Sequence, residues 1–286
     1  MHTDINEQEI IRYYDNCEID YRLVWHLNSQ LCMHYGYWDI STRRLRDALV
    51  NMNKKVAEFG GVRPGDYVLD AGCGVGGSSI FLAKTFNCRV LGITLSEKQV
   101  ETCCGNAMKY HVADQVFFEK QNYLQTHYPD NQFDAVWAIE SVCYAWDKTD
   151  FIKEAFRVLK PGGRLVVADF YEKKVDKGTP EEILLRKWTR CWAIKAYANI
   201  ATFSQTVDQV GFVNRRTRDI TQNVAPSIKR LYYVFFPGIV VSRISQVLRF
   251  RNAIQTANTM STYYQYRAYK KDLWTYQLVT AQKPLK

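Results

Sequence analysis

A glycine-rich turn at residues 68–77 constrains the fold of this chain more than any other segment. Its sequence, VLDAGCGVGG, leads from a short apolar run into a G-x-G-x-G turn formed by Gly72, Gly74 and Gly76. Glycine lets the backbone turn tightly and approach a ligand that any Cβ would hold off. Because helix formers follow at residues 78–84, the segment predicts a buried parallel strand, a turn and a helix. This context indicates a site for a nucleotide-like cofactor.

The turn differs from two common nucleotide-binding motifs. No lysine follows the glycines, as it would in a triphosphate-binding loop, and the spacing is not the G-x-G-x-x-G of dinucleotide enzymes. A different adenosine-bearing cofactor therefore fits the turn better.

Strands and helices are predicted to alternate along residues 67–170, which is typical of βαβ units and a parallel sheet. Gly72, Thr94, Asn122 and Glu140 each follow a predicted strand. Cofactors bind at the carboxyl ends of such strands. We therefore expect these four residues to converge on one edge of the sheet.

The rest of the chain predicts one core with helical additions. Residues 1–60 form an N-terminal helical cap, with helices at 7–14, in a middle segment through 31, and at 42–59. The core then occupies 61–286, with helical insertions at about 171–200 and 221–271. A strand opens at 211–213 and the last strand covers 273–281. The insertion between them, about 50 residues, far exceeds an ordinary hairpin loop, and we interpret it as a substrate lid.

Five segments together resemble the class I S-adenosylmethionine-dependent methyltransferases. They are the glycine turn and residues 89–99, 117–123, 133–145 and 158–169. The resemblance implies an α/β, Rossmann-like fold with a mostly parallel seven-stranded sheet, and S-adenosylmethionine as the cofactor. The G-I-T-L-S-x-x-Q of residues 92–99 is similar to the branch that contains sterol C-methyltransferases, tocopherol methyltransferases and cyclopropane fatty-acid synthases.

The resemblance also implies a set of cofactor contacts. Gln99 takes the ribose contact that many members give to an acidic residue; alternatively, Ser96 and Gln99 form a helix capping box. Asn122 meets the adenine amino group through its carbonyl oxygen, or is simply a turn asparagine. The full set of cofactor-binding residues is Tyr14, Tyr35, Asp70, Gly72, Gly74, Gly76, Thr94, Leu95, Gln99, Asn122, Tyr123 and Ile139.

An aromatic motif, MHYGYWD at residues 33–39, resembles segments that close over the methionine end of the cofactor in this branch. The cofactor carries a sulfonium cation, and an aromatic face can favour a desolvated cation by ~2 kcal/mol. Tyr35 is the first candidate for this contact and Tyr14 the second. The alternative is that these rings pack the cap against the sheet, which is the preferred interpretation for Trp38.

Glu140 is the candidate catalytic acid, together with Tyr35. The segment AIESVCYA at 138–145 resembles the A-I-E-A-T-C-H-A-P of sterol methyltransferases. Methylation of an alkene leaves a carbocation that must be stabilised and then lose a proton, and Glu140 could serve both needs. An oxygen nucleophile also needs a base, so Glu140 does not separate the two reactions. The structural alternative is a carboxylate that caps a helix or pairs with a cation.

The favoured function is C-methylation of an isoprenoid or sterol-like alkene. O- or N-methylation of another apolar metabolite is the alternative within the same class. Cyclopropanation is disfavoured because Ala168-Asp169-Phe170 stands where those synthases usually have a histidine.

Two functions of a different class are nucleic-acid or protein methylation and cofactor binding without catalysis. A nucleic-acid partner is not expected, because the chain has no N-P-P-Y type motif and its cations lie among large apolar residues. A non-catalytic protein would bind the cofactor and transfer no methyl group.

Charge is concentrated in the predicted lid, residues 221–271, which has eight basic residues and no acid. Apolar runs at 231–236 and 239–241 lie among the cations, a combination typical of surfaces that meet anionic amphiphiles. The apolar run is broken at Pro237-Gly238 and is shorter than the roughly 20 residues needed to span a bilayer. We therefore expect peripheral contact with an anionic membrane and no insertion. The cations are Lys229, Arg230, Arg243, Arg249, Arg251, Arg267, Lys270 and Lys271.

The remaining composition predicts a cytoplasmic protein without a metal. Eight cysteines without C-x-x-C spacing indicate reduced, packed thiols. Five histidines are scattered without ligand spacing, so no metal site is expected. Residues 1–12 are polar and have no apolar stretch of the secretory kind.

Overall fold

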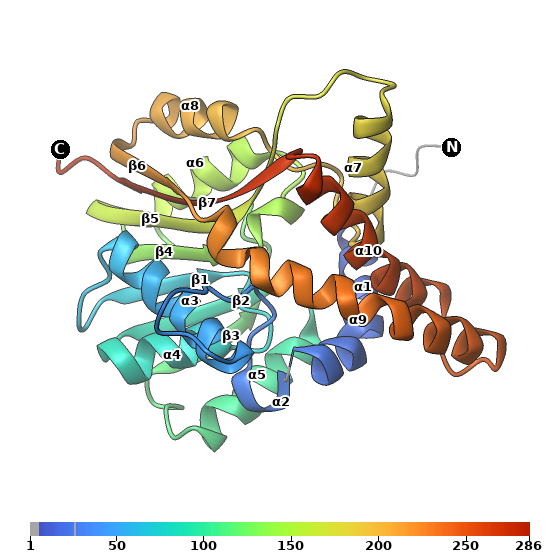
Figure 1. The fold of residues 1–286 in the computed structure, drawn as a ribbon. Helices are drawn as coiled ribbons and strands as arrows, with labels where there is room; N and C mark the ends of the chain where they lie inside the picture. The colour runs from blue at the N-terminus through green and yellow to red at the C-terminus, as the bar shows by residue number, and fades with distance from the viewer. Residues whose placement is uncertain (1–5, 26) are drawn as a thin grey trace.

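The computed structural model describes residues 6–25 and 27–286. In this part of the chain a seven-stranded sheet has the order β3-β2-β1-β4-β5-β7-β6 (Figure 1). The first five strands are parallel, and β7 runs antiparallel to both β5 and β6. The strands are β1 (Tyr67–Ala71), β2 (Arg89–Thr94), β3 (Val116–Lys120), β4 (Phe133–Ile139), β5 (Leu159–Glu172), β6 (Val213–Asp219) and β7 (Trp274–Gln282).

Helices cover both faces of the sheet, which explains why its central strands are apolar throughout. Along β5, Val166 and Ala168 join the core beneath α3 and α4, while Leu165 and Val167 join the core beneath α6 and α8. The helices are α1 (Glu7–Val24), α2 (Leu27–Gln30), α3 (Leu45–Gly60), α4 (Gly77–Phe86), α5 (Glu97–Lys109), the 3₁₀ turn η1 (Val142–Tyr144), α6 (Lys148–Val158), α7 (Pro180–Cys191), α8 (Ile200–Val210), α9 (Thr221–Val247) and α10 (Ala253–Lys270).

In the N-terminal cap, α1 extends further than the sequence predicts and α3 begins later. α1 begins with a capping box between Asn6 and Glu9 and continues to Val24, well beyond the predicted end at 14. α3 begins at Leu45 and not at 42. Its predicted apolar face, at 45, 49, 52 and 56, is buried as expected.

The predicted insertion between the last two strands is a helical hairpin of α9 and α10 that extends away from the sheet (Figure 1). The prediction that Pro237-Gly238 breaks the apolar run is wrong, because α9 continues through both Pro226 and Pro237. Packing against α10 supports the helix across these prolines; the Tyr232 and Tyr266 rings stack with centroids 3.9 Å apart. By length and composition alone α9 could cross a membrane, a test that core helices of soluble proteins also pass, and a third of its apolar stretch is buried within the protein.

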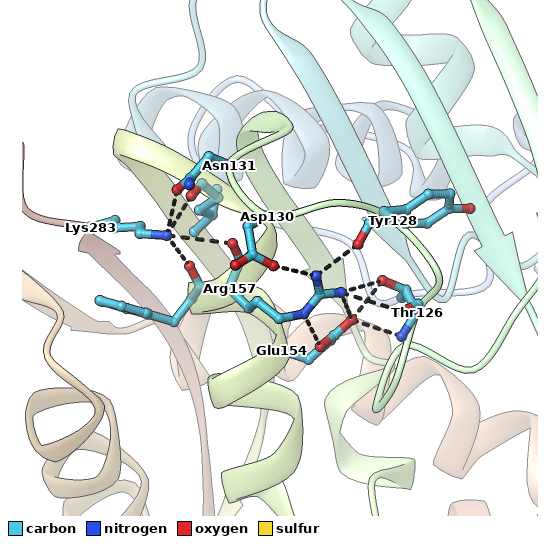
Figure 2. Close-up of polar contacts among 9 residues, drawn as sticks. Thr126, Tyr128, Asp130, Asn131, Glu154, Arg157 and Lys283 are labelled. Atoms are coloured by element: carbon cyan, nitrogen blue, oxygen red, sulfur yellow. Dashed lines mark hydrogen bonds and ion pairs between the residues drawn. The ribbon is translucent and has the colours of Figure 1, made fainter.

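A polar cluster fixes the loop that follows β3 (Figure 2). The Arg157 guanidinium on α6 donates to both carboxylate oxygens of Glu154, at 2.9 and 2.7 Å, and to the carbonyl oxygen of Tyr128 at 2.7 Å. Glu154 in turn accepts from the backbone and hydroxyl of Thr126, at 2.7 and 2.6 Å. Lys283, just after β7, donates to Asn131 at the far end of the loop. The cluster therefore holds residues 126–131 against α6, shortly after the predicted cofactor residues at 122 and 123.

We expect Arg157→Met to destabilise the protein by about 1 to 3 kcal/mol, because it leaves the buried Glu154 carboxylate without its charged partner. Lys153→Met on the same helix is the matched control, since Lys153 is exposed. Urea unfolding of the two variants beside the wild type measures the difference. Equal midpoints for all three proteins would show that the cluster does not hold the loop.

Candidate active site

Two cavities lie side by side over the carboxyl ends of the parallel strands. The first has a volume of about 470 Å³ and is bounded by the glycine turn after β1 and by the residues that follow β2, β3 and β4. The convergence predicted for Gly72, Thr94, Asn122 and Glu140 is present, since all four line this cavity. α1 and the residue before it cover the cavity with Asn6, Glu7, Ile10, Ile11 and Tyr14.

The second cavity, about 380 Å³, is lined mainly by aromatic and aliphatic side chains from α1, β5, α9 and the segments beside α7. The lining of this cavity also includes one ion pair, between Arg251 and Asp20, with N···O distances of 2.6 and 3.0 Å. Its aromatic lining comprises Tyr14, Tyr21, Trp25, Tyr35, Tyr144, Phe170, Trp192, Tyr197 and Phe235.

Four residues line both cavities: Tyr14, Met33, Glu140 and Tyr144. A ligand in the first cavity and a ligand in the second would therefore meet at these side chains. We call these four residues, which border both cavities, the junction.

The glycine turn shapes the floor of the first cavity. Gly72 has a φ of 94°, and a Cβ there would lie 2.4 Å from the Cβ of Ser141. Gly74 has a φ of 57°, and its added Cβ would meet only the Met33 sulfur, at 3.3 Å. Gly76 does not line the cavity; an added Cβ there would lie 2.8 Å from the Phe118 ring. The structure thus shows a packing role for Gly76, and its predicted cofactor contact stays a prediction.

Polar residues also line the first cavity, among them Asp70, Thr94 and Gln99. Asp70 accepts a hydrogen bond of 2.6 Å from Ser79, and burial raises the pKa of its carboxyl to about 7. Gln99 and Thr94 hydrogen-bond to each other at 2.5 Å. Ser96 is the N-cap of α5 and accepts from the Gln99 backbone at 3.3 Å, so part of the capping interpretation is present. Gln99 also lines the cavity together with Leu95, so its ribose contact stays a prediction.

Asn122 and Tyr123 lie beneath the start of α1. The Asn122 side chain accepts from the Leu124 backbone at 2.8 Å, as the turn interpretation predicts, and donates to Glu7 at 2.5 Å. Its carbonyl oxygen keeps a second lone pair. The Tyr123 hydroxyl donates to the carbonyl oxygen of Ser141 at 2.7 Å. Both residues and Ile139 line the first cavity, so their adenine contacts remain predictions.

The aromatic motif divides between the two cavities. Tyr35 is 2% exposed and lines the second cavity but not the first, and its hydroxyl donates to Gln265 at 2.6 Å. Tyr14 lines both cavities, so the structure favours Tyr14 over Tyr35 for the predicted contact with the sulfonium group. Trp38 packs the cap, as its alternative interpretation predicts, because its ring nitrogen donates to Ser227 on α9 at 2.8 Å.

Glu140 is held at the junction in an unusual conformation. Its φ of 51° lies in the left-handed region, which few residues other than glycine adopt. One carboxylate oxygen, Oε1, accepts from the Tyr35 backbone at 2.7 Å and from the Tyr276 hydroxyl at 2.8 Å. Burial raises the pKa of this carboxyl to about 8, although the two hydrogen bonds lower it. Within residues 6–25 and 27–286 it neither caps a helix nor pairs with a cation, contrary to the structural alternative.

Several residues that build this junction have no role in the sequence-based prediction. Tyr276 reaches Glu140 from β7, a strand whose register with residues 164–172 of β5 sets its position. His34 bonds to the Tyr35 carbonyl at 2.9 Å and to Asn53 at 3.1 Å, and burial lowers the pKa of its ring to about 4. Ser78, beside the glycine turn, donates to Asn53 at 2.7 Å. No local signal marks these partners, because each contact depends on tertiary packing.

All eight cysteines are free thiols. The described residues contain no group of three or more His, Cys, Asp or Glu side chains that could hold a metal ion.

Comparison with known proteins identifies the family. Residues 69–167 match the family model of a methyltransferase domain. The 27-O-demethylrifamycin SV methyltransferase of Amycolatopsis mediterranei (strain S699) is 32% identical over 254 residues, which span 88% of this chain and 90% of that protein. The chain belongs to the S-adenosylmethionine-dependent methyltransferases.

Two further similarities confirm the branch and the fold. The probable chloroplastic tocopherol O-methyltransferase of Oryza sativa subsp. japonica is 29% identical over 273 residues, 88% of this chain and 72% of that protein. The solved structure of geranyl diphosphate methyltransferase in complex with GPP and sinefungin matches with a TM-score of 0.77 at 22% identity, covering 97% of this chain and 98% of that one. The Rossmann-like class I fold is thus confirmed. S-adenosylmethionine is the cofactor of this methyltransferase, and the glycine turn, which leaves space that Cβ atoms would fill, fits its adenosyl group.

We expect Gly74→Ala to weaken binding of S-adenosylhomocysteine about tenfold or more, because the added methyl group enters the cavity floor. Gly65→Ala is the control: Gly65 also has a positive φ, of 82°, but nothing lies within 4 Å of its added Cβ. Both variants carry the same kind of backbone strain, so titration calorimetry separates strain from loss of space. Equal affinities in the two variants would remove Gly74 from the cofactor site.

The raised pKa of Glu140 also predicts how stability changes with pH. The folded protein keeps a proton on this carboxyl up to a pH of about 8, whereas the unfolded chain loses it near 4.5. The free energy of unfolding therefore falls as the pH rises through this window. Glu140→Gln removes this contribution, so we expect the variant to gain stability relative to the wild type between about pH 5 and about pH 9. Urea unfolding at several pH values measures this difference in the free energy of unfolding between the variant and the wild type.

Glu101→Gln, at an exposed position on α5, is the control for that experiment and should follow the wild type at every pH. If Glu140→Gln also runs parallel to the wild type, the Glu140 carboxyl is not protonated in the folded protein at neutral pH.

Proposed function

We propose that this methyltransferase transfers a methyl group to a small apolar acceptor bound in the second cavity, with Glu140 as the base. The observation that carries the proposal is the junction at Tyr14, Met33, Glu140 and Tyr144, where the cofactor cavity meets the aromatic cavity. When bound, S-adenosylmethionine supplies an electrophilic methyl group. The chain's own residues have to align the acceptor, exclude water and take up a proton.

Glu140 fits the role of the base. Its Oε1 atom is occupied by the Tyr35 and Tyr276 donors, and among the described residues Oε2 has no hydrogen-bond partner. A carboxyl with a pKa of about 8 is protonated to a large extent at neutral pH, yet it gains basicity once ionised. The two donors fix its orientation, so that Oε2 is the atom available to an acceptor proton.

The acceptor that we favour is an isoprenoid or sterol-like alkene, methylated at carbon. Methylation of an alkene places positive charge on the acceptor, and aromatic faces stabilise a desolvated cation. Aromatic rings lie close to Glu140 in and beside the second cavity. The ring centroids of Tyr35 and Phe170 are 5.3 Å apart, and those of Phe170 and Tyr276 are 4.8 Å apart. The solved structure with a geranyl diphosphate complex supports an isoprenoid-sized acceptor by analogy of fold.

O-methylation of a hydroxyl group on an apolar metabolite is the second candidate. Two relatives that cover most of the chain support this candidate by name. One is the 27-O-demethylrifamycin SV methyltransferase, and the other is the probable tocopherol O-methyltransferase. Glu140 would then remove the hydroxyl proton before or during transfer.

The deciding experiment incubates the protein with methyl-labelled S-adenosylmethionine and an isoprenoid lipid extract. Mass spectrometry locates the labelled product, and its ¹³C NMR shift distinguishes a methyl group on carbon from a methyl ether. A new carbon-bound methyl group supports the favoured acceptor, and a methyl ether selects the second candidate. Cofactor binding without any label transfer would indicate a non-catalytic protein.

We expect Glu140→Gln to lower turnover by roughly two to four orders of magnitude, the usual contribution of a positioned base. Cofactor affinity should change little, because Glu140 contributes one side chain to a cavity with many polar partners. Undiminished turnover would exclude Glu140 as the base.

Tyr276→Phe tests the positioning of the same carboxylate. Loss of the 2.8 Å hydrogen bond removes a group that lowers the pKa of Glu140, so the rising limb of the pH-rate profile should move to higher pH. Tyr171→Phe is the control, since the buried Tyr171 hydroxyl has no hydrogen-bond partner among the described residues. An identical shift in both variants, or none in Tyr276→Phe, would contradict the assigned contact.

A further inference from the structure

The outer side of α9 carries a continuous stripe of exposed apolar side chains. Tyr233, Phe236, Val240, Ile244 and Val247 follow one another at intervals of three or four residues, which places them on one face of the helix. Their exposed fractions run from 50% to 82%, and Phe250 in the following turn is also 82% exposed. Single exposed apolar residues are ordinary, but a contiguous stripe of this length marks an interaction surface. We call these six residues the hairpin stripe.

Cations without partners flank the stripe. Lys229 lies one turn before its start, Arg243 lies beside Ile244, and Arg249 precedes Phe250; all three are exposed. Among the described residues, none of these three side chains has a hydrogen bond or an ion pair. Other cations of the hairpin are neutralised from outside it, as in the pairs Arg251 with Asp20 and Lys271 with Glu181. The stripe therefore presents apolar side chains and uncompensated positive charge together.

The second cavity reaches the surface beside this stripe. Leu23 on α1 and Val234 and Val241 on α9 line the cavity and are also 69%, 40% and 61% exposed. Val241 lies three residues before the stripe residue Ile244, about one helical turn away, so the cavity rim and the stripe are continuous on α9. An acceptor that enters past Val241 would leave an apolar surface and reach the aromatic cavity without crossing open water.

We propose that the hairpin stripe docks on an anionic lipid bilayer and that the second cavity opens toward that bilayer, which delivers the apolar acceptor. The route rests on the proposed function; the docking does not. Lipid headgroups complement the unpaired cations, while the stripe enters the boundary between headgroups and acyl chains. The inner side of α9 stays packed on the protein, with Ile228 and Ser242 buried, so the helix lies along the membrane surface and does not cross it.

A second copy of the chain fits this surface less well. A two-fold interface would place the same patch against itself, and the unpaired cations would then face one another without an acid anywhere in residues 221–271. Like charges in a desolvated interface oppose association. An anionic bilayer satisfies both features of the surface.

Cosedimentation with vesicles tests the docking. We use phosphatidylcholine vesicles with and without phosphatidylglycerol, at low and high salt. The wild type should sediment with the anionic vesicles at low salt and much less at high salt. Lys229→Glu/Arg243→Glu/Arg249→Glu should bind about tenfold more weakly or worse. Phe236→Ser/Val240→Ser/Val247→Ser should also lose binding, since it removes the apolar part.

The matched control, Lys120→Glu/Lys153→Glu/Lys177→Glu, makes the same charge change at exposed positions outside the hairpin and should bind like the wild type. No sedimentation of the wild type, or an equal loss in the control, would overturn the docking. Analytical ultracentrifugation adds one check: a dimer that dissociates only in the hairpin variants would assign the stripe to a second copy and overturn the bilayer as its partner.

The cavity opening is tested by quenching. A fluorophore on Val241→Cys, in a Cys104→Ser background because Cys104 is the exposed cysteine, should be quenched by nitroxide-labelled lipids when vesicles bind. The same fluorophore on Lys153→Cys should not be quenched. Binding without quenching at residue 241 would overturn the route while leaving the docking intact. Neither readout involves turnover, so failure here is distinguishable from failure of methyl transfer.

Discussion

The partly buried carboxylate of Glu140 joins three segments that are far apart in the sequence, and the site depends on this contact. Its Oε1 atom accepts the backbone N–H of Tyr35 from the N-terminal cap and the hydroxyl of Tyr276 from β7. Both donors compensate part of the cost of burial, which still raises the pKa of the carboxyl to about 8. A conformation with φ at 51° is retained because these packed segments hold it. The same constraint places the carboxylate where the two cavities meet.

Residues of α1 line both cavities. Its first turns cover the first cavity and contact Asn122 through Glu7, at 2.5 Å. Its last turns hold the hairpin, because Asp20 pairs with Arg251 and accepts from Asn258 at 3.0 Å. One helix thus forms the roof of the first cavity and part of the wall of the second. Exclusion of water from the junction therefore depends on a segment outside the sheet.

The parallel sheet and its first glycine turn could be predicted well because the signals for strands and turns are local in the sequence. The strand, glycine turn and helix around Gly72 are read from periodicity and turn chemistry, and the comparisons confirm the fold and the cofactor. The errors arose where packing overrides local preference: Pro237 lies within a continuous helix because α10 supports it. Tyr35 lines the second cavity and not the first, where its hydroxyl bonds to Gln265 on α10, so its predicted contact with the cofactor stays a prediction. Contacts such as Tyr276 with Glu140 have no local signature at all.

The most direct test of the junction is a crystal structure of the protein with S-adenosylhomocysteine and an apolar acceptor analogue bound together. We expect the cofactor sulfur beside Tyr14 in the first cavity and the analogue in the second, aromatic cavity. The reacting atom of the analogue should lie within hydrogen-bond reach of Glu140 Oε2, at about 3 Å or through one water. An analogue bound outside the second cavity, or separated from the cofactor by Glu140 and Tyr144, would contradict it.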